Sequence, residues 1–467
     1  MLTISAVPRS NHMTRMLPPS QARGYAQQHD DAIWATFCEI MGTQAWQGDQ
    51  LARDIASLPG REAGLGLRSA ARASPAAYWA SWMAALPVVH EKWPRLADRM
   101  VDALEQGSTD NSIGEADSAR AEFLRQGAGA PTWAEARDGA EPPQPPEGHD
   151  LYDFRCGWQS HMCTFAENHF RVHTVLPRCS RSHQALLLSQ ATGPGSTWLR
   201  AVPSEPALHF RPLRLQVALR RRLRWPLPLS GGQCCNGCKK QLDSWGDRAA
   251  ACGTSGRIKL RSAPIEKTWA RVLREAGGRV RENMLIRDLA VPNIDPIDGR
   301  KVEVVVTSLP LAHGVPAVVD ATMVSPLHAD GTPWPRTHLT GGHSFARARR
   351  HKETTYPELV DSPLVHLVVA GMEVGGRMSQ EAVQLIDVAA VHRAQSEPRA
   401  LRRQAARAWR ARWLTLLGVA GQDALAATLV QEGHKVLDAA VGTEPSGTDV
   451  WLDGDFAEGL SSVLVPA

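Results

Sequence analysis

Residues 301–306 read Lys-Val-Glu-Val-Val-Val and residues 318–322 read Val-Val-Asp-Ala-Thr, and these two runs decide the fold of the chain. Both runs are rich in valine, and β-branched residues are typical of strands. We therefore predict strands at 302–309 and 315–324, joined by a turn that contains His313-Gly314. Each strand carries one carboxylate among apolar neighbours.

The segments on either side extend this pattern to a mixed domain. Upstream, an amphipathic helix is expected to begin at Pro264 and to end at Gly277-Gly278, before an alternating strand at 279–289. Downstream, a basic helix around 343–355 precedes an apolar strand at 364–372. The order of helix, three strands, helix and strand predicts an α-β-β-β-α-β core of the α+β or α/β class.

The rest of the chain is predicted to be mainly helical. Apolar residues recur at helical spacing on both sides of the core, whereas the segment 107–150 is rich in Gly, Ser, Asp, Glu and Pro, as linkers are. We divide the chain into a helical region at 1–106, a flexible linker at 107–150, a helical region with a basic end at 151–230, a cysteine-rich element at 231–256, the mixed domain at 257–375, C-terminal helices at 376–440 and a loose tail at 441–467.

The composition is that of a chain with sizeable hydrophobic cores. Of the 467 residues, 43% are hydrophobic and 21% are charged, and a net charge of +4 permits nucleic-acid binding without arguing for it. No apolar run of about 18 residues suggests a membrane span, and the N-terminus does not resemble a signal peptide. Few cysteines in so long a chain suit a reducing compartment. We expect a nuclear or cytoplasmic protein that is neither secreted nor attached to a membrane.

Glu303 and Asp320 form the strongest candidate site. If the turn is centred near Ala312-His313, Glu303 lies opposite Thr322 and diagonal to Asp320, so these side chains share one face of the sheet. Two carboxylates this close repel each other, and a hard cation such as Mg²⁺ or Mn²⁺ between them relieves the repulsion. The alternative is that both acids end their strands and face water.

A cation at this site would suit phosphodiester hydrolysis. It would polarise the scissile phosphate and activate water, and a nearby amine would stabilise the developing charge. Lys352, in the basic helix after the predicted hairpin, is the candidate for that amine. Arg349 and Arg350 in the same helix are candidates for contacts with nucleic-acid phosphates.

Three cysteines suggest a zinc site. Cys235 and Cys238 form a Cys-x-x-Cys pair, which provides two ligands on one turn, and Cys252 follows downstream. A tetrahedral site takes four ligands, but Cys234 is adjacent to Cys235, and Arg248, which cannot ligate a metal, stands where a histidine would complete the set. The pattern leaves open a zinc site and a metal-free or degenerate knuckle.

A dense basic stretch precedes these cysteines. It consists of Arg220, Arg221, Arg222 and Arg224 and is followed by Trp225. A solvated helix face is the usual explanation of such a stretch. Contact with the phosphates of DNA or RNA is the alternative, because a tryptophan interleaves and the cysteines follow at once.

Two further segments suggest catalysis at first sight but fit structural roles. Asp30-Asp31 lies inside a predicted helix at 18–42, whereas a polymerase places paired aspartates on a tight hairpin. Residues 64–69, Gly-Leu-Gly-Leu-Arg-Ser, are too short for a dinucleotide fingerprint and fit a helix start, with an aromatic core stripe at 78–82. Because no polymerase palm is evident, we expect no DNA synthesis by this chain alone.

The order of these motifs resembles the C-terminal end of non-LTR retrotransposon polyproteins that carry a restriction-endonuclease-like domain of the PD-(D/E)XK fold. The resemblance covers roughly 7–105 and 185–435. It implies a piece of a longer polyprotein or a decayed copy. The motifs that carry it are Cys235 to Cys252, Pro264-Ile265-Glu266, Lys301 to Val305, Val319 to Thr322 with Ser325-Pro326-Leu327, Lys352 to Tyr356, and the segments 64–69 and 78–82, which resemble the region after a reverse-transcriptase palm.

The resemblance implies a role for each matching acid. Glu266 matches an acid of the first helix that helps to hold the metal. Glu303 matches the first strand carboxylate, although an aspartate after proline is usual there and Lys301-Val302 stands instead. Asp320 matches the acid of the (D/E)XK element.

Two departures from the family pattern affect the expected chemistry. Thr322 occupies the place of the family's lysine, so Lys352 would supply a migrated amine. Arg248 replaces the histidine of the family's knuckle, which weakens the case for zinc.

Three functions are consistent with these observations. The first is a metal-dependent endonuclease that nicks DNA, and the second is an inactive nucleic-acid-binding remnant of a retroelement. The third is a helical scaffold for protein interactions, suggested by the arginine- and alanine-rich segment 378–433. Binding by the second would rest on the basic stretch Arg220–Arg224 and on Arg402, Arg403, Arg407, Arg410 and Arg412.

Overall fold

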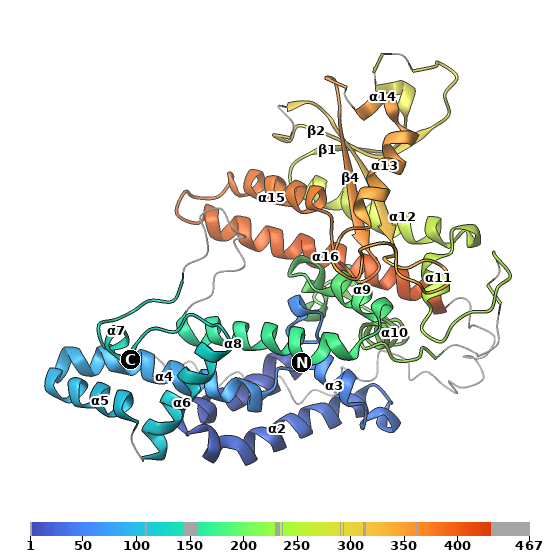
Figure 1. Ribbon diagram of the computed structural model, residues 1–467. Helices are drawn as coiled ribbons and strands as arrows, with labels where there is room; N and C mark the ends of the chain where they lie inside the picture. The colour runs from blue at the N-terminus through green and yellow to red at the C-terminus, as the bar shows by residue number, and fades with distance from the viewer. Residues whose placement is uncertain are drawn as a thin grey trace, which may run out of the picture.

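The architecture is that of a computed structural model, in which a small sheet with its helices lies beside a larger helical half (Figure 1). The structure describes residues 2–107, 110–143, 157–228, 234–235, 237–289, 291–292, 294–311, 314–360 and 362–430. The predicted tail at 441–467 and part of the predicted linker lie outside these residues.

Four strands form one mixed sheet. They are β1 (Arg279–Leu285), β2 (Lys301–Thr307), β3 (Ala317–Val324) and β4 (His366–Glu373), in the spatial order β1-β2-β3-β4. β2 runs antiparallel to both β1 and β3, whereas β3 and β4 are parallel. A parallel pair needs a crossover connection, and the segment with α13 (Phe345–Thr355) and α14 (Pro357–Val360) provides it. The chain is a mixed α+β protein, and the predicted order of helix, three strands, helix and strand is confirmed.

The register of β2 against β3 differs from the prediction. Val304 pairs with Val319, and the same register, continued, brings Glu303 opposite Asp320 and not opposite Thr322. The expected turn centre at Ala312-His313, which lies outside the described residues, was placed too far along the chain. Directly opposed residues of an antiparallel pair still share a face, so the conclusion that the two acids lie together does not depend on this error.

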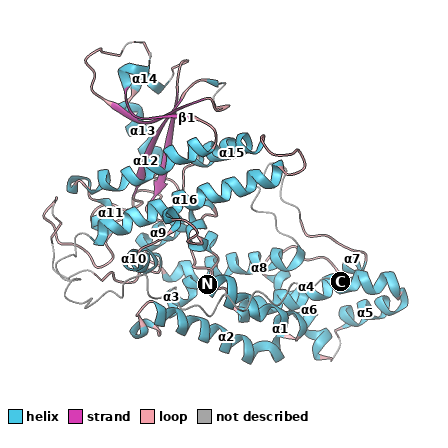
Figure 2. Ribbon diagram, turned by 180° about the vertical axis from the view of Figure 1, so that it is seen from behind, coloured by secondary structure: helices cyan, strands magenta, loops and turns pink. Residues whose placement is uncertain are grey.

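Helices cover both faces of the sheet (Figure 2). One face packs against α12 (Arg257–Glu275), α15 (Gln380–Ala394) and α16 (Arg402–Val430), which share a single hydrophobic core with the strands. The other face packs against Tyr356 and Leu359 around α14. The division predicted at residue 375 is therefore not a boundary in the packing, because the helices after it complete the core of the sheet.

The first helix of this half begins earlier than predicted. We expected a start at Pro264, but α12 begins at Arg257 and contains the proline. The added turns are fixed by Arg261, which is buried and donates hydrogen bonds to the carbonyl oxygens of Ala250 (2.7 Å) and Ala249 (3.2 Å). Sequence periodicity cannot reveal such an anchor, because its partners lie in another segment.

α16 is a core helix, although it is the one helix in the described ranges that is long and apolar enough to cross a membrane. Of its most apolar window, 78% is buried inside the protein. Its buried residues belong to the same hydrophobic core as the sheet. A helix that is packed on all sides is apolar over most of its surface, which explains why α16 is as long and apolar as a membrane-spanning helix.

The remaining helices build the N-terminal half and the junction with the sheet. They are α1 (Asn11–Met16), α2 (Pro19–Ile40), α3 (Gln50–Ala56), α4 (Ala70–Lys92), α5 (Pro94–Gln106), α6 (Asn111–Arg125), α7 (Trp133–Arg137), α8 (Gly157–Phe170), α9 (Arg181–Gln190), α10 (Pro212–Arg222) and α11 (Asp247–Ala251). Two hydrophobic clusters, one around Trp34 and Trp225 and one around Trp79 and Trp133, hold the N-terminal half together, whereas buried residues of α10 and α11 join the core of the sheet.

The aspartate pair in α2 has a structural role, as expected. Asp30 accepts hydrogen bonds from the backbone amide of Ala70 (2.7 Å) and from the hydroxyl of Ser69 (2.6 Å), at the beginning of α4. Asp31 forms an ion pair with Arg53 at 2.5 Å. A carboxylate at a helix N-terminus satisfies amides that have no partner within the helix, which explains why an acid stands there.

The linker predicted at 107–150 contains two helices within its described residues 110–143, so the expectation of a flexible linker was wrong for that part. Asp110 caps α6, and Thr132 and Glu135 form a capping box at the start of α7. Phe123 and Trp133 are buried in the cluster around Trp79. Alanines supply most of the remaining apolar contacts, and their small side chains give a weak helical pattern.

Candidate functional site

Glu303 and Asp320 lie together where β2 and β3 separate. The paired residues of the ladder end at Val304 and Val319, and beyond them the backbone amide of Ala321 donates a hydrogen bond to Oε2 of Glu303 at 2.5 Å. The glutamate side chain thus occupies the position that a neighbouring strand's carbonyl would otherwise take. This hydrogen bond places the Glu303 carboxylate beside Asp320, on the face of β3 that packs against the crossover segment.

Lys352 of α13 completes a group of three charged side chains. Its Nζ atom lies 2.6 Å from Oδ1 of Asp320, and the exposed fractions of the two side chains are 18% and 1%. The sequence placed this lysine only in the helix after the hairpin. The structure brings it to the buried aspartate, on the face of the sheet where α13 crosses from β3 to β4.

The end of α13 is fixed against the beginning of β2. The hydroxyl of Tyr356 donates a hydrogen bond to the carbonyl oxygen of Lys301 at 2.9 Å. The guanidinium of Arg300 donates to the carbonyl oxygen of Thr355 and forms an ion pair with Glu358 at 2.7 Å. Sequence analysis had assigned no role to Tyr356 or Arg300. The tyrosine lies one helical turn after Lys352, which was the available signal that the two act on the same face.

The electrostatics of Glu303 reflect burial beside other acids. Burial, followed by the charges of Asp320 and Glu266, raises the pKa of Glu303 to about 8, against the lowering effects of Lys352 and of the Ala321 amide. Glu266 of α12 is half-buried and acts on the same carboxyl from the helix that covers the sheet. The three predicted acids and the predicted lysine therefore form one electrostatic unit.

Asp320 is the most buried member of the site. Burial raises the pKa of this carboxyl, while Lys352 and, less strongly, His351 lower it. Its Oδ2 atom is buried and accepts no hydrogen bond from the described residues. A buried carboxylate oxygen is costly to leave without a partner, so Oδ2 is a ligand atom suited to a cation or to a hydrogen-bonding group. His351, exposed on α13, was not among the predicted residues.

The three predicted cysteines also come together. The sulfur atoms of Cys235, Cys238 and Cys252 lie within 4.8 Å of one another, so the cluster can hold a metal such as zinc. Cys235 and Cys238 lie on a tight turn in which Lys239 adopts a positive φ of 58°. Cys252 follows directly after α11.

The cysteine cluster favours one negative charge on Cys252. Burial opposes ionisation, but hydrogen bonds from Thr254 and from the neighbouring thiols lower the pKa of Cys252 to about 6. Cys235, whose pKa is raised by burial, donates to that sulfur at 3.6 Å. Thiolates are the ligands that zinc prefers, and a thiolate already formed near neutral pH lowers the cost of metal binding.

The basic stretch before the cysteines is engaged inside the protein. Arg222 is 2% exposed and donates hydrogen bonds to the carbonyl oxygens of Gly64 (2.9 Å) and Gly60 (2.8 Å). Arg224 forms an ion pair with Asp247 at 2.5 Å. These two arginines join the N-terminal half to the cysteine-rich element and α10, so neither a solvated helix face nor a phosphate contact describes them.

The other two arginines of the stretch are also directed inward. Arg221 donates to the carbonyl oxygen of Trp245 at 2.6 Å, and Arg220, which is half-buried, donates to that of Pro226 at 3.5 Å. Pairing with backbone carbonyls requires tertiary structure, which a charge pattern alone does not reveal. The predicted nucleic-acid contact by this stretch is not supported by its placement.

The two predicted arginines of α13 differ in their surroundings. Arg349 forms ion pairs with Glu353 and Glu381, both at 2.8 Å, and thereby ties α13 to α15. Arg350 is exposed and has no ion pair within the described part of the chain. It lies, however, on another side of α13 from Lys352 and the acids.

Comparison with known proteins adds no relative. Neither a protein-family model nor a curated protein sequence matches the chain. The site is therefore interpreted from its own geometry and charges.

Proposed function

We propose that this chain is a metal-dependent nuclease that hydrolyses a phosphodiester bond of DNA at the site formed by Glu303, Asp320 and Lys352. The observation that carries the proposal is a buried pair of acids on neighbouring strands, with an ammonium 2.6 Å from one of them. The order of elements and the positions of Glu266, Glu303 and Asp320 also agree with the resemblance to restriction-endonuclease-like domains of retrotransposons.

The donor set fits a hard divalent cation. Glu303 and Asp320 offer carboxylate oxygens, which Mg²⁺ and Mn²⁺ prefer, and Oδ2 of Asp320 is buried without a hydrogen-bond partner among the described residues. Burial, and then the charges of Asp320 and Glu266, raise the pKa of Glu303, so a cation bound beside it would favour its ionised form. When bound, such a cation would supply Lewis-acid chemistry at the scissile phosphate.

The side chains of the protein itself provide orientation and charge. Lys352 holds Asp320 in place through their ion pair, and Glu303 is held by the Ala321 amide. Arg350 is exposed on another side of α13 from Lys352, so it would contact a phosphate only away from the acids. In the reaction, water adds to phosphorus, one P–O bond breaks and the leaving oxygen takes up a proton.

The test is a nicking assay on supercoiled plasmid with Mg²⁺ or Mn²⁺. Wild-type protein is expected to convert the plasmid to its open-circular form, and chelation by EDTA is expected to abolish the conversion. Asp320→Asn and Glu303→Gln should each lower the rate by about a hundredfold or more, because each removes charge from the site in which phosphate is activated. Glu282→Gln, on the neighbouring strand β1 and paired with Arg274, is the matched control and should retain activity.

Two outcomes would remove the proposal. One is the absence of nicking by folded wild-type protein with either cation, which would leave the inactive nucleic-acid-binding remnant as the better explanation. The other is nicking that persists unchanged in Asp320→Asn and Glu303→Gln, because the activity would then arise elsewhere.

A further inference from the structure

A cavity of about 580 Å³ separates the loop at residues 59–68 from α8 and α16. It also borders η7 (Pro194–Arg200), and it is distinct from both sites described above. Its volume is that of a pocket for a ligand of small-molecule size. Four arginines reach its lining: Arg61, Arg68, Arg200 and Arg410.

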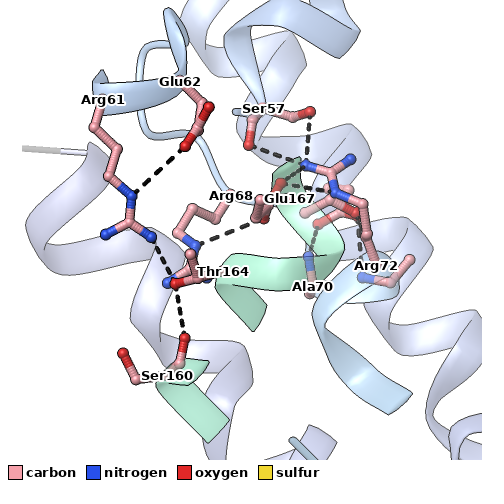
Figure 3. A network of polar contacts seen from close by, with 12 residues as sticks. Ser57, Arg61, Glu62, Arg68, Ala70, Arg72, Ser160, Thr164 and Glu167 are labelled. Atoms are coloured by element: carbon pink, nitrogen blue, oxygen red, sulfur yellow. Dashed lines mark hydrogen bonds and ion pairs between the residues drawn. The ribbon is translucent and has the colours of Figure 1, made fainter. Parts of the chain in front are cut away.

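Figure 3 shows the polar network beside this cavity, in which Arg61, Arg68 and Arg72 lie around Glu62 and Glu167. Arg72 and Arg68 both approach the buried Glu167, at 2.7 Å and 3.7 Å, so one carboxylate serves two guanidinium groups. The closer partner is Arg72. The charge of Arg68 is therefore less fully compensated than that of Arg72, and its side chain, which lines the cavity, is 42% exposed.

The second acid of the wall is also shared. Arg171 lies 2.7 Å from Glu62, whereas the Nε atom of Arg61 lies 4.0 Å from it. Arg61 donates its other strong hydrogen bond to a neutral group, the hydroxyl of Thr164, at 2.6 Å. Among the described residues that line the cavity there are four arginines and one acid, Glu62, so the lining carries a surplus of positive charge.

Arg200 also lines the cavity, at the end of η7. It is exposed and has no ion pair among the residues that the structure describes. Arg410, by contrast, is neutralised by Asp387. Like charges held around one cavity repel each other, and an anion bound between them relieves that repulsion.

We propose that this cavity binds phosphate groups of a single nucleic-acid strand, with Arg68 and Arg200 as the principal contacts. The planar guanidinium matches two oxygens of a phosphate, which makes arginine the preferred residue for this ligand. A cavity of small-molecule size accepts one or two nucleotide units but not the width of a duplex. The proposal does not rest on the proposed nuclease, because it requires binding alone.

The test measures binding of a fluorescein-labelled oligodeoxythymidylate to the full chain by fluorescence anisotropy across a salt series. The double variant Arg68→Gln/Arg200→Gln is expected to bind about tenfold more weakly or worse at low salt. The slope of log K against log salt should fall by about 1.4, because each phosphate contact on a single strand contributes about 0.7. Arg72 remains to pair with Glu167, so the fold should persist.

The matched control is Arg95→Gln/Arg99→Gln. These two arginines are exposed on α5, outside the cavity lining, and their replacement removes the same total charge. An equal loss of affinity in the control would overturn the proposal, because binding would then depend on net charge alone. If the double variant unfolds, Arg200→Gln alone decides the question, since this side chain has no ion pair within the described residues to lose.

Inorganic tripolyphosphate separates a strand from a small soluble anion. If tripolyphosphate displaces the labelled strand only at an ionic strength at which chloride also displaces it, the result supports a nucleic-acid strand as the ligand. If micromolar tripolyphosphate displaces the labelled strand, and tripolyphosphate binding is lost in Arg68→Gln/Arg200→Gln, the ligand is a soluble polyphosphate. That result would overturn the proposal of a nucleic-acid strand.

Discussion

The ammonium of Lys352 lies 2.6 Å from Oδ1 of Asp320, and this ion pair joins the crossover helix α13 to the central strand β3. The aspartate is buried, whereas the lysine is in partial contact with solvent. A buried charge depends on its partner far more than an exposed one does. The pair is therefore a feature of stability as well as of the proposed chemistry.

Removal of the lysine alone should destabilise the protein. Lys352→Met is expected to lower the free energy of unfolding by about 3 kcal/mol, because it leaves a buried carboxylate without a counter-charge. The loss should be larger at pH 8 than at pH 5, since the carboxyl can escape the penalty by protonation. Urea denaturation followed by circular dichroism measures both quantities.

The double variant Lys352→Met/Asp320→Asn controls for this interpretation. It removes both charges, so its stability should lie closer to that of the wild type than to that of Lys352→Met. Equal destabilisation of the single and double variants would show that packing of the lysine stem, and not the charge of Asp320, determines the loss.

The raised pKa of Glu303 predicts how the free energy of unfolding depends on pH in the absence of divalent cations. Its pKa is raised from 4.5 to about 8 in the folded protein, so the folded state keeps a proton that the unfolded state has already released between these values. The folded state binds more protons in this window, and the contribution of Glu303 to stability therefore falls as pH rises from about 4.5 to 8.

The difference between wild type and Glu303→Gln isolates that contribution. The amide cannot ionise, so the melting temperature of the variant should decline less between pH 5 and pH 8 than that of the wild type. Addition of Mn²⁺ at pH 8 should raise the melting temperature of the wild type but not of the variant. Parallel pH profiles for the two proteins would contradict the assignment.

The strands and the acids could be predicted from the sequence because their signals are local. Valine runs mark β2 and β3, and a carboxylate among valines stands out wherever the strand lies. The register of β2 against β3 could not be predicted, because it depends on the shape of the loop that connects them, which the sequence leaves open. The structure pairs Val304 with Val319, two positions away from the predicted register. Because side chains alternate between the two faces of a strand, a shift of two positions leaves Glu303 and Asp320 on the same face.

Charge patterns were harder to interpret than apolar ones. The stretch before the cysteines resembled a nucleic-acid contact, yet Arg222 is buried against the carbonyl oxygens of Gly60 and Gly64. The surplus of charge instead surrounds the cavity beside Arg68 and Arg200, which are far apart in the sequence and gave no local signal. An arginine's role is set by the oxygens that tertiary structure places around it.

The internal role of Arg222 leads to a third prediction. Arg222→Met should lower the free energy of unfolding by about 3 kcal/mol, because two buried carbonyl oxygens lose their donors. Arg350→Met, a matched change on an exposed side chain, should alter it by less than about 0.5 kcal/mol. If the unfolding curves of Arg222→Met and wild type coincide, the basic stretch does not hold the two halves together.

The cysteine cluster yields the last prediction, which concerns metal content. Protein purified with zinc present should retain about one zinc per chain, since three sulfur atoms within 4.8 Å supply most of a tetrahedral set and solvent can supply the fourth ligand. Cys238→Ser should weaken zinc binding at least tenfold, as measured by competition with a chromogenic chelator. Cys234→Ser, the matched control on an exposed neighbour, should bind as the wild type does. Retention of zinc by Cys238→Ser together with loss in Cys234→Ser would show that the metal uses a different set of ligands.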